Sequence, residues 1–155
     1  GGSMSSRLFI NLRERNGLAY FVRTSNEFYS DSGYLATQAG VPRDKIEMAI
    51  KIILEEYKKL TTEVIPEKEL RRAKDILQGR VALQMEASDN LANWYAQQAM
   101  YRKNILTPGE LIKKIKKISA LDIQKVARQI FVNRHLNLAI IGNVNEKKIK
   151  AILHL

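Results

Sequence analysis

One stretch near the start of the chain constrains the fold more than any other, because its periodicity changes at a single point. It reads SSRLFINLRERNGLAYFVRTSNEFYSDSGY over residues 5–34. Apolar side chains recur at helical spacing in residues 5–15, whereas residues 18–29 are typical of a strand. Asn16-Gly17 separates the two patterns, and both residues tolerate the left-handed backbone that ends a helix. The sequence therefore predicts a helix, a tight corner and a strand.

The rest of the chain adds strands and several helices to this beginning. Turn residues occupy 30–33, so residues 34–41 are predicted to return as the second strand of an antiparallel hairpin. A third strand is predicted at 135–141, where the sequence is HLNLAII. Helical patterns begin near residues 42, 66, 88, 107, 119 and 145. This order indicates an α+β fold, an antiparallel sheet with helices layered on one face, and residues 1–155 are predicted to form a single domain.

The charge and composition of the chain narrow the classes of protein to which it can belong. Lys and Arg number 26 against 16 Asp and Glu, so the net charge is +10. A basic nucleic-acid-binding module is one reading of this excess, but the basic clusters lie on separate predicted helices without interleaved aromatic side chains, which argues against it. The absence of cysteine, of a long apolar run and of a recognisable signal peptide favours a cytoplasmic location.

Residue patterns for common catalytic chemistry are absent. His135 and His154 are isolated and belong to no zinc-binding motif, and the sequence has no nucleophile elbow and no P-loop. Most carboxylates alternate with Lys and Arg, which is typical of solvated helix faces. Glu86 is the exception because it stands among apolar residues, although a structural role is still favoured for it. No metal site is therefore predicted in this chain.

Several motifs follow one another along the chain, namely Ser5-Ser6-Arg7-Leu8-Phe9, Leu12-Arg13-Glu14 and Gly17-Leu18-Ala19-Tyr20, followed by EKELRRAKDILQGRVALQMEASDNLANW and LNLAIIGNV. Together they resemble the C-terminal, non-zinc half of the pitrilysin and insulinase superfamily of zinc metallopeptidases, the inverzincins. The processing-peptidase branch is the most similar. The resemblance thus covers nearly the whole chain.

This resemblance implies a function for the corner at Gly17. Enzymes of the family pair a half that carries zinc with a half that carries none, and both enclose an unfolded peptide substrate. The second half lends an Arg and a Tyr near the scissile bond, and these positions match Arg13 and Tyr20. A guanidinium and a neutral phenol can both donate hydrogen bonds to the oxygen that becomes negative in the transition state. The alternative is that Arg13 pairs with a surface Glu and that Tyr20 packs in the hairpin.

The resemblance also implies that the chain is part of a longer protein. Helices and a strand precede this point in the family, so Gly1-Gly2-Ser3 is either a native glycine-rich approach or an expression scar. We expect no cofactor in this chain, zinc in the other half, and no peptidase activity from the isolated chain. The expected partners are the zinc-bearing half or subunit, a peptide substrate and, through open sheet edges, a second copy of the chain, but no membrane. A non-catalytic, structural relative of the same superfamily remains the alternative function.

Overall fold

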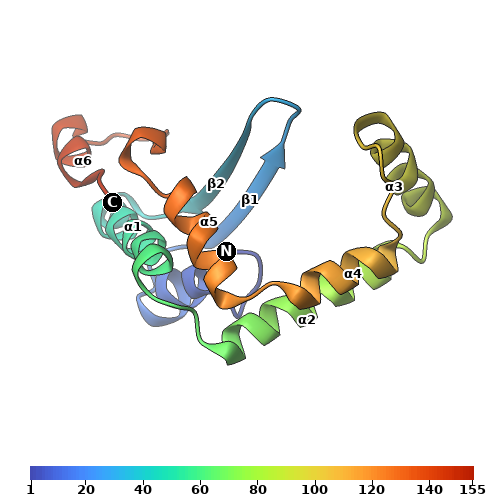
Figure 1. The fold of residues 1–155 in the computed structure, drawn as a ribbon. Coiled ribbons are helices and arrows are strands. Elements are labelled where there is room, and N and C mark those ends of the chain that lie inside the picture. Colours follow the sequence, from blue (N-terminus) through green and yellow to red (C-terminus); the bar gives the residue numbers. More distant parts are fainter. The chain divides into compact units, whose positions relative to one another are not determined.

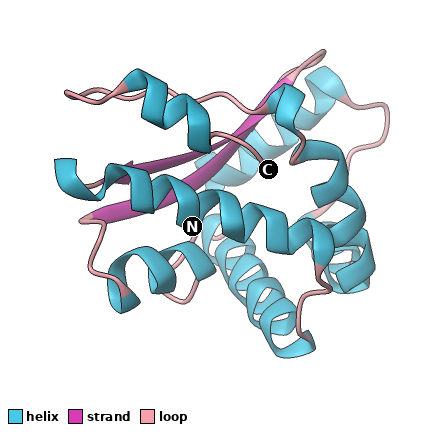
Figure 2. Cartoon of the chain, turned by 90° about the vertical axis from the view of Figure 1, so that its left-hand side faces the viewer, coloured by secondary structure: helices cyan, strands magenta, loops and turns pink.

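The computed structural model describes residues 1–155, and the chain divides into two compact units. Unit 1 comprises Gly1–Glu63 and Val126–Leu155, and unit 2 comprises Val64–Lys125. The predicted hairpin and the predicted helices are all present (Figures 1 and 2), which confirms the α+β class. That all 155 residues act as a single domain stays a prediction.

Unit 1 contains the antiparallel hairpin and the helices that pack against it. Its elements, in chain order, are the π-helix η1 (Phe9–Arg15), the strands β1 (Phe21–Phe28) and β2 (Gly33–Gly40), the 3₁₀ turn η2 (Arg43–Lys45), the helix α1 (Ile46–Thr62), the end of α5 (Ala120–Ile130), the 3₁₀ turn η3 (Asn133–His135) and the helix α6 (Glu146–Ile152).

The hairpin has one covered half and one exposed half. Its register runs from the pair Phe21 and Gly40 at the base to the pair Phe28 and Gly33 at the tip. Near the base, a chain of hydroxyl groups joins the two strands to α1, because Tyr57 donates a hydrogen bond to Thr37, whose oxygen lies 2.7 Å from that of Thr24. From the pair Asn26 and Leu35 to the tip, the side chains are exposed on both faces of the hairpin. The hairpin is therefore anchored at its base only.

The buried core of unit 1 explains why the predicted helix and hairpin form together. One apolar cluster joins η1, β1 and α1, and a second joins α1 to α6. The members of the first are Leu8, Leu12, Leu18, Ala19, Val22 and Ala49, and those of the second are Ile50, Leu54 and Ile149. Neighbours in sequence supply much of the first cluster, so η1 and the start of β1 are buried together.

The prediction of a third strand at 135–141 is wrong. The sheet has only two strands, and the segment begins in the turn η3 and then continues without a strand ladder. Leu136 and Ile140 nevertheless pack against the second apolar cluster. The alternating pattern that predicted a strand therefore serves side-chain packing here, because no neighbouring strand supplies backbone hydrogen bonds.

Unit 2 is helical, and its helices begin where the sequence predicted. They are α2 (Glu67–Gln84), α3 (Ser88–Tyr101), α4 (Pro108–Lys117) and most of α5. Thr107 and Glu110 form a capping box at the start of α4. The helices α2 and α4 are adjacent, and Lys74 Nζ donates a 2.9 Å hydrogen bond to the carbonyl of Lys116 in the last turn of α4. The negative end of the helix dipole also stabilises a cation at that position.

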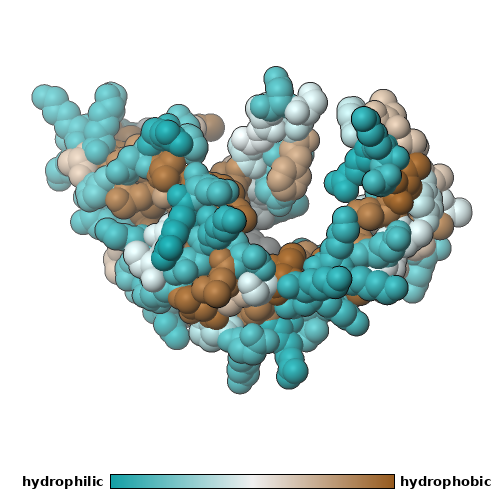
Figure 3. Space-filling model, viewed as in Figure 1, coloured by the Kyte–Doolittle hydropathy of each residue, from teal (hydrophilic) through white to brown (hydrophobic).

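The surface is mainly hydrophilic but carries scattered apolar side chains. Brown apolar groups appear among teal hydrophilic ones on the face shown in Figure 3. Fully or largely exposed examples include Phe28, Leu83, Tyr101 and Ile141. No helix is both long enough and apolar enough to cross a membrane.

Candidate functional site

The corner at Gly17 is closed by backbone hydrogen bonds. The amide of Gly17 donates to the carbonyl of Arg13 at 3.0 Å, and the amide of Leu18 donates to the carbonyl of Leu12 at 2.7 Å. Gly17 has φ of 56°, a left-handed conformation that favours glycine. This resembles a Schellman ending, except that each bond reaches one residue further back. The difference follows from η1, since a π-helix holds one more residue in each hydrogen-bonded ring than an α-helix.

Buried residues fix the backbone on both sides of this corner. Leu12 is 0% exposed and Leu18 is 1% exposed, so each side of the turn is embedded in the core. The amide of Tyr20 donates a 2.9 Å hydrogen bond to the carbonyl of Gly40, which joins the start of β1 to the end of β2. The Phe21 ring covers Gly40 so closely that a Cβ there would lie 2.6 Å from the ring. The corner is thus a fixed platform.

Both predicted donors lie on the outside of this platform. The Tyr20 side chain is 86% exposed, and its hydroxyl makes no hydrogen bond within the chain. The Arg13 guanidinium lies over the Phe9 ring, with 5.2 Å between its carbon and the ring centroid, and it forms no ion pair. Neither side chain has the structural role that was the alternative, namely a pair with a surface Glu or packing in the hairpin. Their participation in a reaction stays a prediction.

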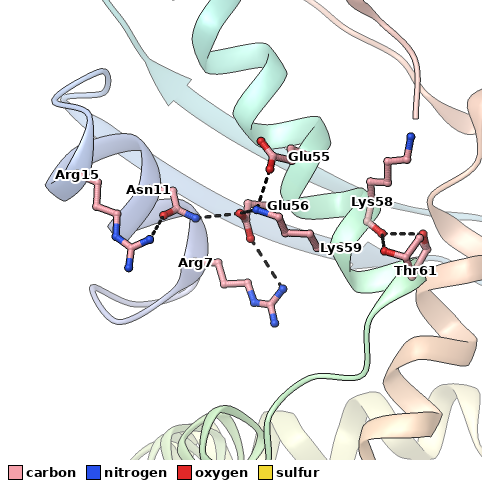
Figure 4. Close-up of polar contacts among 9 residues, drawn as sticks. Arg7, Asn11, Arg15, Glu55, Glu56, Lys58, Lys59 and Thr61 are labelled. Carbon is pink, nitrogen blue, oxygen red and sulfur yellow. Dashed lines mark hydrogen bonds and ion pairs between the residues drawn. The ribbon is translucent and has the colours of Figure 1, made fainter.

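The structure adds one buried polar cluster that the sequence did not reveal (Figure 4). Glu56 of α1 is only 5% exposed, and its carboxylate accepts a 2.9 Å hydrogen bond from Asn11 Nδ2 of η1. Lys59 Nζ lies 3.0 Å from the same carboxylate, and Arg7 Nη1 lies 3.8 Å from it. We call these four residues the Glu56 cluster. Glu86, which the sequence singled out instead, is exposed.

One feature of the sequence could have indicated this cluster, namely the position of Glu56 in the apolar periodicity of α1. Its neighbours Glu55, Lys58 and Lys59 make the region look like a solvated face, yet Glu56 lies between the buried side of the helix and η1. Helical periodicity alone does not distinguish a charged residue at that boundary from an exposed one.

The residues of this chain do not fit a zinc ion. No group of three or more His, Cys, Asp or Glu side chains lies close enough together to hold a metal. The one buried carboxylate, Glu56, is surrounded by cationic and amide donors, which would repel a metal cation. His135 and His154 are both exposed and lie in separate segments.

Burial and hydrogen bonding perturb few titratable groups near the corner. Burial raises the pKa of the Tyr57 phenol, and its hydrogen bond with Thr37 opposes this shift. Tyr57 also stacks on Phe131, with 4.4 Å between ring centroids. Tyr57 is therefore packed and hydrogen-bonded as a structural residue, whereas the Tyr20 side chain is exposed.

Comparison with known proteins identifies the class to which this fold belongs. The family described as the Peptidase M16 inactive domain matches residues 1–77. A Rickettsia felis protein described as an uncharacterized zinc protease is 38% identical over 135 residues, which cover 84% of this chain and 32% of the relative. The chain belongs to the M16 peptidases, and corresponds to the C-terminal half of a pitrilysin-type zinc metallopeptidase.

Two further similarities extend beyond the matched region. The mitochondrial-processing peptidase subunit alpha-2 of Dictyostelium discoideum is 27% identical over 146 residues, 94% of this chain and 32% of that subunit. A conserved protein of Enterococcus faecalis V583 has a crystal structure with a TM-score of 0.74 and 25% identity, over 83% of this chain and 30% of that chain. The chain thus spans about a third of the length of the curated relatives that it matches.

Proposed function

We propose that this chain is the metal-free half of a zinc-dependent endopeptidase, and that it binds an extended peptide at the Gly17 corner. Arg13 and Tyr20 would contact the carbonyl of the scissile bond or its close neighbours. The zinc would be held by another half or subunit. Relatives described as zinc proteases support this assignment, and so does the description of the matching family as an inactive domain.

One observation carries the proposal. Two strong hydrogen-bond donors, Arg13 and Tyr20, are exposed and have no hydrogen-bonding partner in the chain, although the residue that precedes each of them is buried. Donors that stand on a fixed backbone and lack an internal partner are suited to an external acceptor on which charge develops. The peptide carbonyl oxygen is such an acceptor, since it becomes negative as the carbonyl is attacked.

The proposal includes a partner. One relative is described as a subunit of a processing peptidase, so at least one protein with this fold works in an assembly. We propose that the partner here is the zinc-bearing half, either within the same polypeptide or as a separate subunit. An H-x-x-E-H motif in that partner would favour the enzyme over the non-catalytic alternative.

The test is made in the full-length protein together with its zinc-bearing half. Tyr20→Phe and Arg13→Ala should each lower kcat by about 10²–10³, the usual loss for one oxyanion donor, without changing the zinc content. The matched controls are Tyr29→Phe and Arg134→Ala, which alter an exposed tyrosine and an exposed arginine elsewhere, and they should leave turnover unchanged. Wild-type turnover in Tyr20→Phe or in Arg13→Ala would remove that side chain from the proposed site.

A further inference from the structure

We infer that Glu56 is a positioning residue for the Gly17 corner, because its buried carboxylate holds η1 in the winding that directs Arg13 outward. This inference rests on the proposed function, since Glu56 acts only through Arg13. It adds the helix α1 (Ile46–Thr62) to the elements that serve the site.

The Glu56 carboxylate is held by donors on three sides. A buried charge is costly unless donors compensate it, and here an amide, an ammonium and a guanidinium surround one carboxylate. Two of these donors, Arg7 and Asn11, belong to the N-terminal helix and are four residues apart, so both face α1 (Figure 4). The Glu56 cluster therefore fixes the rotation of this helix about its own axis.

The rotation of the N-terminal helix about its axis sets the direction of Arg13. Phe9 and Arg13 are also four residues apart and contact each other, but they are offset by two residues from the pair Arg7 and Asn11. Two residues turn a helix by about half a revolution. Arg13 thus faces away from α1 for as long as Asn11 faces towards it.

The Glu56 cluster also bears on the π-helical winding of η1. Such winding is uncommon, and irregular backbone persists where its surroundings define it. Asn11 is held three times, because its amide donates to Glu56, its side-chain oxygen accepts from Arg15 at 3.2 Å, and its carbonyl accepts from Asn16 Nδ2 at 2.6 Å. If the bond to Glu56 were lost, η1 could rewind as an α-helix, and Arg13 and Gly17 would rotate relative to Asn11.

A double-mutant cycle in the full-length protein with its zinc-bearing half tests this role. Glu56→Ala should lower kcat by about tenfold to a hundredfold, the loss expected from a misplaced group, and should change KM little. In the Arg13→Ala background the same substitution should cost no more than about twofold, because the group that it positions is already absent. The matched control is Glu55→Ala, which removes the neighbouring carboxylate that also pairs with Lys59, at 2.9 Å, but is exposed. It should leave turnover unchanged.

Two further variants guard against simple unfolding. Glu56→Gln keeps an oxygen that can accept from Asn11 and should retain most of the turnover. Asn11→Ala removes the same hydrogen bond while Glu56 keeps Lys59, so it should show the same non-additivity with Arg13→Ala even if Glu56→Ala does not fold.

The outcomes separate this inference from the proposed function. If Arg13→Ala is slow but Glu56→Ala is either additive with it or fully active, the positioning role is overturned and the proposed function stands. A Glu56→Gln variant as slow as Glu56→Ala would also overturn it, because charge rather than the bond to Asn11 would then matter. If Arg13→Ala has wild-type turnover, the proposed role of Arg13 fails and the positioning role fails with it.

Discussion

Unit 1 and unit 2 contain similar helical patterns, but different interactions stabilise the inside of each unit. Unit 1 buries ten hydrophobic side chains, nine of them in its two apolar clusters, whereas unit 2 buries only three, namely Ile65, Leu70 and Ile115. Unit 2 relies instead on polar contacts, such as the buried amide of Gln98, which both donates to and accepts from the backbone of Leu106. Helical periodicity thus predicts a face, but it does not predict how completely that face is covered.

The largest expected change in stability comes from a substitution in the apolar core of unit 1. Leu12→Ala should lower the free energy of unfolding by about 2–5 kcal/mol, because the side chain is fully buried and leaves a cavity. Leu83→Ala in unit 2 is the matched control and should change it by less than about 0.5 kcal/mol, since Leu83 is 69% exposed. Chemical denaturation measures both. Equal effects would mean that the two units do not differ as described.

The next largest change comes from removing the polar contact between Gln98 and Leu106 in unit 2. Gln98→Ala should cost about 1–3 kcal/mol, because it leaves the amide of Leu106 without its partner. Hydrogen exchange at that amide should become faster. The carbonyl of Leu106 keeps its hydrogen bond from Trp94, so the loop should loosen rather than unfold. The exposed neighbour serves as control, and Gln97→Ala should leave the exchange unchanged.

Two glycine substitutions should act in opposite directions. Gly17→Ala should destabilise unit 1 by about 1–2 kcal/mol, because its φ is left-handed while nothing lies within 4 Å of the new Cβ. Gly79→Ala should stabilise unit 2 by about 0.5–1 kcal/mol, because Gly79 lies inside α2 with equally open surroundings. Thermal unfolding of both variants tests the pair. A stabilising Gly17→Ala would mean that the corner is not held in the left-handed conformation.

The smallest effect concerns the helix caps of unit 2. Hydrogen bonds from the Thr107 backbone and side chain lower the pKa of Glu110, and those from the Ser119 side chain and backbone lower that of Asp122. A lowered pKa in the folded state means that the stabilisation is present above the unfolded-state pKa and is lost as the pH falls through the folded-state pKa. The protection factor of the Glu110 amide, which compares its exchange with that of an unstructured amide at the same pH, should therefore fall in acid. Thr107→Ala should weaken this fall, because alanine keeps only the backbone donor to Glu110, and a protection factor that does not change with pH in the wild type would contradict the assignment.

The sequence predicted the parts of the fold that depend on neighbours in the chain. The hairpin, the corner at Gly17 and the starts of α2 and α4 all follow from local chemistry, and they lie within a few residues of their predicted positions. The strand at 135–141 failed because a strand needs a partner, and no local pattern shows whether one is present. The π-helical winding of η1 was equally hidden, since Leu8 and Leu12, four residues apart, fit either kind of helix.

The candidate site divides in the same way. Arg13, Gly17 and Tyr20 were predicted because they lie within one short motif that resembles the family's, whereas the burial of Glu56 depends on a contact with Asn11, 45 residues away in the chain. A charged residue in a charged neighbourhood gives no local sign of such a contact. The sequence therefore predicts the donors of a site more readily than the residues that orient them.

The anchoring of the hairpin at its base gives it the mechanics of a lever. Three register pairs, from Asn26 and Leu35 to the tip, extend beyond the covered region, a length of about 10 Å at 3.4 Å per residue. The tip at Phe28 lies four residues beyond Thr24, so a small bend at the fulcrum formed by Thr24, Thr37 and Tyr57 would displace it by the bend angle times an arm of about 14 Å. The exposed ring of Phe28 would travel furthest, while Tyr20 would stay in place, because its amide is bonded to Gly40 beside the buried core.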